Sequence, residues 1–356
     1  MPLQTTRTSL PLTLEEVNPD WLTRVLRTQF PGVTITSTVR GAERAGTSTS
    51  ARFALTYAAG GTGLPAAVYV KGGFDAVMRR RVWAALIQEA RFYAELADDV
   101  PLNIPRAYFA GVDEQGRQGV VILEDLTARG VRFGHATDNV TLDSVAACVT
   151  GLAALHARFW GNTRLGPYRH WAEPQRAYLR YLCRPKHWAD VLRRPDADLL
   201  VQLLPTPEAA LAGLDAMWAA NDARTPTLLH GDCHGGNLFF EADGHPGFLD
   251  WQCTFPGNPG HDLGELLLTT LDTGDRRGWE RDLIGLYRDV LVGHGVRDAP
   301  SREKLWLDYR RNIMHDMVSS VLNPYDMQTA EVTTITAGRT LRAAHDLDLL
   351  DALAQP

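Results

Sequence analysis

The stretch LLHGDCHGGNLFF, residues 228–240, limits the folds that this chain can adopt. Its apolar ends predict two short buried strands, and its polar, glycine-rich middle predicts a tight loop between them. The loop carries His230, Asp232, His234 and Asn237 within eight positions. Three interpretations compete: a metal site, a catalytic loop that handles phosphate, or a polar turn without chemistry.

The sequence around this stretch predicts an α+β protein with two lobes. In the first part, β-branched and aromatic runs predict five strands at residues 33–40, 51–58, 65–73, 105–113 and 119–126, with helices at 18–28 and 75–96. From about residue 128 onward, helical patterns dominate, at 142–160, 173–182, 207–221, 262–271, 278–291, 302–322 and 329–346. We therefore expect a small β-rich lobe over 1–127, with a hinge near 124–127, and a larger, mainly helical lobe over 128–356 that contains the β island.

Charge and hydropathy exclude several classes of protein. The formal net charge is −6 and no basic run of five residues occurs, which argues against a protein that binds nucleic acid. No apolar stretch approaches the ~18 residues of a membrane span, and the first residues lack the apolar core of a signal peptide. The 4 cysteines form no C-x-x-C pair, which suits a reducing compartment. We expect a cytoplasmic protein without a nucleic-acid or membrane partner; its oligomeric state stays open.

The metal interpretation rests on His230, Asp232 and His234. Their i, i+2, i+4 spacing would place the three side chains on one face of a strand, as a metal-dependent hydrolase could use them. The neighbouring glycines indicate a turn rather than a strand, and no H-x-x-x-H pair follows downstream. The pattern therefore gives this interpretation little support.

The phosphate interpretation uses more of the sequence. A kinase-type loop places an Asp that accepts the proton of the acceptor hydroxyl five positions before an Asn that binds metal, and a second metal-binding Asp follows. Asp232 and Asn237 have this spacing, and Asp250 follows after a hairpin-like segment. The pattern predicts Asp232 as catalytic base and Asn237 and Asp250 as ligands of Mg²⁺, because Mg²⁺ prefers oxygen donors.

These motifs resemble those of the aminoglycoside phosphotransferase and choline kinase superfamily. The resemblance rests on H-G-D-x-x-x-x-N at 230–237 and LD at 249–250, and on the segments QEARFYAEL, VVILEDL and LAALHARFWG. In character the chain is most similar to the ecdysteroid-kinase-like small-molecule kinases. The resemblance implies a protein-kinase-like fold, with ATP and Mg²⁺ as cofactors. It also implies phosphate transfer to a hydroxyl of a small molecule, such as a hydroxylated metabolite, a steroid-like compound or an antibiotic. A nucleotide-binding pseudoenzyme of the same fold is the alternative.

The resemblance assigns the nucleotide-binding residues of the first lobe. Lys71, at the end of a strand, matches the lysine that binds the α and β phosphates, and Glu89 on the next helix matches its carboxylate partner. The run GAERAGTSTS at 41–50 takes the place of the glycine-rich phosphate loop, with Thr47 and Ser48 as the residues expected to contact phosphate.

The remaining assignments concern the hinge and the loop. The backbone at Glu124 and Leu126 is expected to bind the adenine edge. His234 is a candidate contact to phosphate or substrate, although it could equally tie the loop to its neighbours. His230 lies next to the apolar strand and is expected to have a structural role. Asp262, at a helix start, resembles the family's acidic residue that steadies the catalytic loop through its amides.

Aromatic residues are dense before the catalytic loop. They are either core residues or the lining of an acceptor pocket, and Trp160 is the candidate for a substrate contact. In a pocket they would favour a flat or apolar hydroxylated acceptor, and the segment is not acidic enough to suggest a polycation. The residues are Trp160, Tyr168, Trp171, Tyr178, Tyr181 and Trp188.

Overall fold

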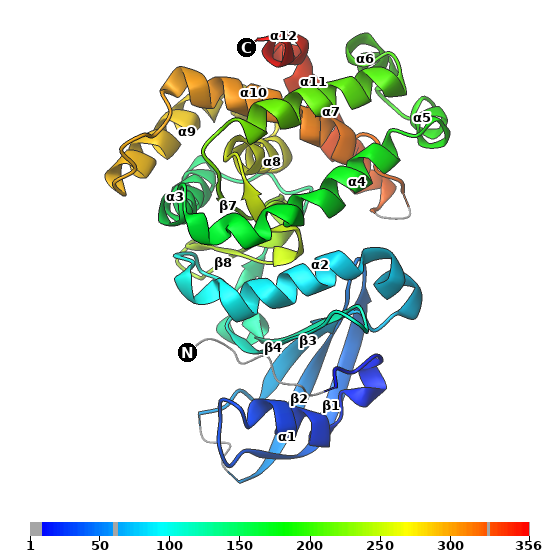
Figure 1. Ribbon diagram of the computed structural model, residues 1–356, viewed down its shortest axis with the longest axis vertical. Coiled ribbons are helices and arrows are strands. Elements are labelled where there is room, and N and C mark those ends of the chain that lie inside the picture. Colours follow the sequence, from blue (N-terminus) through cyan, green and yellow to red (C-terminus); the bar gives the residue numbers. More distant parts are fainter. Residues whose placement is uncertain (1–8, 60–62, 326–327, 356) are drawn as a thin grey trace. The chain divides into compact units, whose positions relative to one another are not determined.

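The computed structural model describes residues 9–59, 63–325 and 328–355 and divides into two compact units. The first comprises Met1–Val131 and Leu249–Cys253, and the second comprises Arg132–Phe248 and Thr254–Pro356. Strands dominate the first unit and helices the second, as the sequence predicts (Figure 1). The sequence did not predict that a short segment from late in the chain would pack within the first unit.

The first unit is built on an antiparallel sheet with the strand order β1-β2-β3-β5-β4. Its strands are β1 Thr34–Ala45, β2 Thr49–Ala59, β3 Ala67–Gly72, β4 Ala107–Asp113 and β5 Gln118–Glu124. The loop expected over 41–50 is much shorter than predicted, because the polar run continues the ladder as far as the pair Ala45 and Thr49. Its side chains are exposed at 41–46 and half-buried at 47–50, and backbone pairing in a hairpin needs no apolar residues there.

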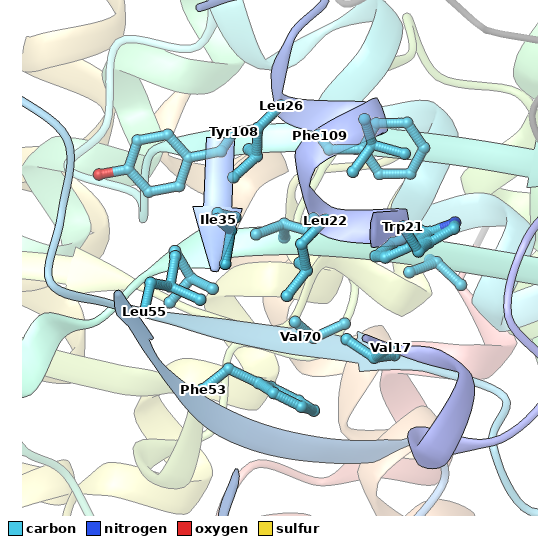
Figure 2. Close-up of a cluster of buried hydrophobic side chains, with 14 of the residues drawn as sticks. Val17, Trp21, Leu22, Leu26, Ile35, Phe53, Leu55, Val70, Tyr108 and Phe109 are labelled. Atoms are coloured by element: carbon cyan, nitrogen blue, oxygen red, sulfur yellow. The ribbon is translucent and has the colours of Figure 1, made fainter. Parts of the chain in front are cut away.

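Helix α1 (Pro19–Leu26) packs on one face of this sheet. Asn18 begins the helix by accepting a hydrogen bond from the backbone N–H of Trp21 at 2.9 Å. Trp21 then meets Phe109 of β4 edge to face, with ring centroids 5.7 Å apart. Figure 2 shows Leu22 and Leu26 of α1 among the side chains of strand residues, such as Ile35 and Phe109. The buried cluster includes Val17, Trp21, Leu22, Leu26, Ile35, Phe53, Leu55, Val70, Tyr108 and Phe109.

Helix α2 (Ala76–Glu95) packs on the opposite face of the sheet. Neighbouring strand residues point to opposite faces, and Val120 of β5 belongs to the α1 cluster. A Cβ at Gly119 would lie 2.0 Å from the backbone oxygen of Leu86 in α2, so glycine allows the close approach of helix and strand. The same alternation in β3 buries Val70 on the α1 side and turns Lys71 toward α2.

The second unit contains short strands within a helical framework. Strand β7 (Thr227–Leu229) pairs with β10 (Phe255–Gly257), and β8 (Leu238–Phe240) pairs with β6 (Arg132–Phe133) and β9 (Pro246–Phe248). The predicted helices are present as α3 Leu142–Phe159, α4 Ala172–Leu182, α7 Pro207–Asp222, α8 Gly260–Thr270, α9 Thr273–Gly293, α10 Arg302–Ser319 and α11 Ala330–Asp346.

Among the described residues, three further α-helices were not predicted: α5 Pro185–Val191, α6 Ala197–Leu203 and α12 Leu349–Ala354. Each spans about two turns or less, which is too short for a helical period to stand out in the sequence. Helix α8 is buried along its whole length, and this makes it a rigid support for the elements that contact it. Within the described ranges, no helix has the length and apolar character needed to cross a membrane.

Candidate active site

The loop at 230–237 connects two buried strands of the second unit, as expected. It leaves β7 at Leu229 and enters β8 through a turn of 3-10 helix, Gly235–Asn237. Gly231 has a φ of +80°, a conformation that favours glycine. A Cβ at Gly235 would lie 2.9 Å from the backbone oxygen of His135. These glycines therefore let the loop turn sharply and pack closely against the backbone beside it.

Asp232 and Asn237 are brought together by this loop. The amide nitrogen of Asn237 donates to the backbone oxygen of Asp232 at 2.7 Å and to its carboxylate Oδ2 at 3.1 Å. The Asp232 side chain is 27% exposed, whereas Asn237 is buried. The loop thus presents one carboxylate to solvent and fixes it from behind with an amide.

Asp262, in the first turn of α8, holds the start of the loop. Its carboxylate accepts from the backbone N–H of His230 at 2.8 Å and of Gly231 at 2.9 Å. His156 of α3 lies 3.1 Å from the same carboxylate, and both side chains are fully buried. Burial acts to raise the pKa of Asp262, but the hydrogen bond from His156 and the nearby histidines outweigh it and lower the pKa to about 2.

The two loop histidines do not converge on a metal position with Asp232. His230 is fully buried and its Nδ1 accepts from the backbone N–H of Asp232 at 3.3 Å. His234 accepts from the backbone N–H of Gly236 at 3.0 Å, and its Nε2 lies 3.9 Å from Asp232. Each ring therefore uses one nitrogen to stabilise the loop. This arrangement does not support a hydrolase metal site at these three residues.

In the first unit, Lys71 lies between two carboxylates. Its Nζ is 2.8 Å from Glu89 of α2, the partner expected from the sequence, and 2.7 Å from Asp250. Burial disfavours the charged ammonium, but the two carboxylates outweigh it and raise the pKa of Lys71 above its usual value. Burial raises the pKa of Glu89, and the negative charge of Asp250 raises it further. The positive charge of Lys71 acts in the opposite direction.

Asp250 belongs to the segment Leu249–Cys253, which packs within the first unit. The ring of Trp251 in this segment stacks on Phe92 of α2, with centroids 4.1 Å apart and planes 4° from parallel. Asp250 itself has a φ of +61°, a strained conformation for a residue other than glycine. The stacked tryptophan and the bond to Lys71 hold the carboxylate in this conformation.

The structure places the other first-unit candidates as follows. Thr47 and Ser48 form the tip of the β1–β2 hairpin and are half-buried. Glu124 ends β5, and its backbone N–H donates to the backbone oxygen of Arg106 at 2.9 Å, so this donor is already paired. Leu126 begins a 3-10 turn, Leu126–Arg129, and its side chain is buried.

Trp160 directly follows helix α3. Its indole nitrogen donates to Asp298 at 3.1 Å, and the next residue, Gly161, donates to the backbone of Pro226 at the start of β7. Trp171 and Trp188 are buried, and Tyr178 stacks with Tyr181 at 6.4 Å. The segment is therefore largely occupied in packing within the second unit.

A protein-family model described as the phosphotransferase enzyme family matches residues 73–302, well over half of the chain. The chain belongs to this family. Membership confirms the expectation that this phosphotransferase is a small-molecule kinase. No curated protein matches the chain.

Solved structures with the same fold as this phosphotransferase include the choline kinase LicA from Streptococcus pneumoniae. The similarity to LicA has a TM-score of 0.51 at 13% identity and covers 94% of this chain and 99% of that chain. An aminoglycoside-3'-phosphotransferase of type VIII is 20% identical, with a TM-score of 0.45 and coverage of 83% and 98%. A spectinomycin phosphotransferase with ADP and spectinomycin is 12% identical, with a TM-score of 0.48 and coverage of 93% and 98%. The similarity to LicA confirms the kinase-like fold.

Two carboxylates that the sequence did not predict lie near Asp232 in this phosphotransferase. Glu265 of α8 accepts from the backbone N–H of Cys233 at 2.9 Å, and Asp316 of α10 lies close to Glu265. Glu265 follows Asp262 by three residues, a spacing that places both on one face of a helix, so it could have been predicted. Asp316 carries no local signal, because it reaches the site only through the packing of α10 on α8.

Proposed function

We propose that this protein transfers the γ-phosphoryl group of Mg·ATP to a hydroxyl of a small-molecule acceptor, with Asp232 as the catalytic base. The observation that supports this best is the fixed catalytic loop. Buried groups of α8 bind the backbone before and after Asp232, and Asn237 binds its carboxylate, while the carboxylate stays accessible. A base needs this combination of fixed position and access to the acceptor.

Lys71 is the proposed phosphate-binding residue. A flexible lysine side chain loses conformational entropy when it binds a ligand. Glu89 and Asp250 already restrict Lys71 to one position, so less entropy remains to be lost on binding. Its ammonium stays charged, as binding of the α and β phosphates requires. Thr47 and Ser48 are proposed to contact phosphate from the hairpin tip. The backbone near Glu124 and Leu126 is proposed to bind adenine through groups other than the paired N–H of Glu124.

Asn237 and Asp250 are the proposed ligands of Mg²⁺. The donor set fits, because Mg²⁺ prefers carboxylate and carbonyl oxygens and the amide nitrogen of Asn237 is turned toward Asp232, which leaves its amide oxygen as the ligand atom. When bound, Mg²⁺ offsets the negative charge of the nucleotide phosphates. Asp250 also contacts Lys71, so the residue proposed to bind metal helps to position the residue proposed to bind phosphate.

Asp232 acts on the acceptor. In phosphoryl transfer the protein mainly positions the reactants, because the transition state is loose. A carboxylate beside the hydroxyl orients it and takes its proton as the new bond to phosphorus forms. His234, 3.9 Å from Asp232, is proposed to contact the acceptor or the transferred phosphate through its Nε2.

The acceptor class is tested by screening. Hydroxylated metabolites, sterols and antibiotics would be offered with Mg·ATP, and acceptor-dependent ADP release would be measured, with the phosphorylated product confirmed by phosphorus NMR. For each active acceptor, the analogue lacking the hydroxyl is the matched control. The proposal expects ADP release only with the hydroxylated member of a pair. Nucleotide binding without transfer to any acceptor would instead support a pseudoenzyme.

A further inference from the structure

Glu265 binds the backbone of the catalytic loop just after Asp232, whereas the carboxylate of Asp262 binds the backbone before it. Its Oε2 accepts from the backbone N–H of Cys233 at 2.9 Å, and Cys233 directly follows Asp232. Asp262 binds the two amides before Asp232. Both carboxylates come from the fully buried helix α8, three residues apart and therefore on the same face. The backbone on both sides of Asp232 is thus held by one rigid element.

The contact between Glu265 and Cys233 is shielded from water. Glu265 is 6% exposed and Cys233 is 0% exposed, and the thiol of Cys233 donates to the backbone oxygen of Asp262 at 3.1 Å. A hydrogen bond in such surroundings is electrostatically stronger than one exposed to water, because the local dielectric constant is low. Losing it would leave a buried N–H without a partner and release the loop on one side of Asp232.

A second buried acid, Asp316, lies beside Glu265. Ligand atoms of Glu265, Asp316 and His315 all lie within 4.8 Å of one another, and neither carboxylate oxygen of Asp316 has a hydrogen-bond partner. Burial and the neighbouring carboxylates raise the pKa of both acids, so the pair retains protons above the usual range. A carboxyl oxygen accepts a hydrogen bond in either protonation state, and an uncharged amide oxygen should replace it.

We propose that Glu265 is a positioning residue, which fixes Asp232 through the backbone amide of Cys233. The inference rests on the proposed function, because the residue that it positions is the proposed base. Displacing a reacting group by about 1 Å can cost up to ~10²-fold in rate. Loss of the contact should therefore lower kcat by roughly 10- to 100-fold. The KM for ATP should change little, because Glu265 is buried in α8 and is not among the residues proposed to bind the nucleotide.

The test compares three variants of the full chain. Glu265→Leu removes the acceptor, Glu265→Gln retains an amide oxygen, and Thr269→Val is the matched control. Thr269 is a buried residue of α8, and its hydroxyl donates to the backbone oxygen of Glu265 at 2.7 Å. It makes no contact with the Glu265 carboxyl through this bond. If Glu265→Leu does not fold, Glu265→Asp replaces it, because the shorter side chain keeps the carboxyl group but does not reach Cys233.

The first measurement needs no catalysis. In protein labelled with ¹⁵N at its 4 cysteines, amide hydrogen exchange reports on each one separately. We expect Glu265→Leu to speed the exchange of Cys233 by about tenfold or more relative to the other cysteines. Glu265→Gln and Thr269→Val should stay within roughly threefold of the wild type. Unchanged protection of Cys233 in Glu265→Leu would overturn the inference.

The second measurement is acceptor-dependent turnover. We expect kcat to fall in Glu265→Leu and to be largely restored in Glu265→Gln, with the KM for ATP nearly constant. Equal loss in Glu265→Gln and Glu265→Leu would overturn the positioning role. If the wild type itself transfers no phosphate, the proposed function fails, while the exchange experiment still decides whether Glu265 holds the loop.

Discussion

Replacing Asp316 by Asn should stabilise this protein at neutral pH, although the residue is almost completely buried. Asp316 is 1% exposed and both its carboxylate oxygens lack hydrogen-bond partners. Burial, together with the charge of Asp232, raises its pKa well above the usual value. Folding at pH 7 therefore requires either a buried charge or the uptake of a proton, and the neutral amide avoids both.

The size of the effect follows from the cost of that proton. Protonating a carboxyl with an unfolded pKa of about 3.9 costs about 4 kcal/mol at pH 7, which is the most that Asp316 can cost the native state there. An Asn amide has a second N–H donor that the protonated carboxyl lacks, and leaving this donor without a partner costs about 1–3 kcal/mol. The net gain in the free energy of unfolding should be about 1–3 kcal/mol at pH 7.

The sign of the pH dependence is a stricter test. A carboxyl whose pKa is raised by folding makes the folded state bind protons more tightly. The stability of the wild type then falls as pH rises above about 4, by up to about 1.4 kcal/mol per pH unit, until the folded pKa is reached. Asp316→Asn has no carboxyl to titrate at this position and does not lose this stability, so the difference in the free energy of unfolding between the variant and the wild type should grow with pH.

Urea unfolding at pH 5, 6, 7 and 8 measures both the size of the stabilisation and its dependence on pH. Asp308→Asn is the matched control, since Asp308 lies on the same helix and is also buried, but it binds Arg224 at 2.9 Å. Removing that carboxylate should destabilise the protein by about 2 kcal/mol. A destabilised Asp316→Asn variant at pH 8, or an effect that does not change between pH 5 and pH 8, would refute the reasoning.

Three further predictions concern the site. Lys71→Ala should lower kcat strongly, and Glu89→Ala less, because Asp250 still contacts Lys71 at 2.7 Å; a fully active Glu89→Ala variant in steady-state assays would contradict this. Asp250→Asn should weaken Mg²⁺-dependent ATP binding in calorimetry without unfolding the protein, and unchanged affinity would count against the metal assignment. Asp262→Asn should destabilise the protein by about 1–3 kcal/mol in urea unfolding at pH 6. Folding lowers the pKa of Asp262 to about 2, so its contribution to the free energy of unfolding is present above about pH 4 and is lost as pH falls toward 2. The difference in stability between wild type and Asp262→Asn should therefore be smaller at pH 3 than at pH 6. An equal difference at the two pH values would refute this prediction.

Much of this site could be predicted from local sequence patterns. The spacing of Asp232 and Asn237 fixes which residues one short loop can bring together, and the structure joins them by hydrogen bonds. Lys71 and Glu89 lie on consecutive elements, a strand and the helix after it, so their ion pair needs only local packing. Patterns of this kind depend on few long-range contacts.

The rest depends on contacts between distant parts of the chain. His156 of α3 reaches Asp262 across 106 positions of sequence, and Asp316 approaches Glu265 from another helix. Asp250 contacts Lys71 over 179 positions, because its segment packs within the first unit. The indole nitrogen of Trp160, the candidate for a substrate contact, donates to Asp298, 138 positions further along the chain. No local period or motif encodes such contacts.

The most direct test of the proposed mechanism is acceptor-dependent ADP release by wild type and Asp232→Asn, with the affinity for Mg·ATP measured in parallel. An amide keeps the shape and the hydrogen bonding of the carboxylate but cannot take the proton, a role worth roughly 10²–10⁴-fold. We expect the variant to fold, to bind Mg·ATP as the wild type does, and to lose transfer by a factor in that range. Equal transfer rates from the two proteins would contradict the assignment of Asp232 as the base.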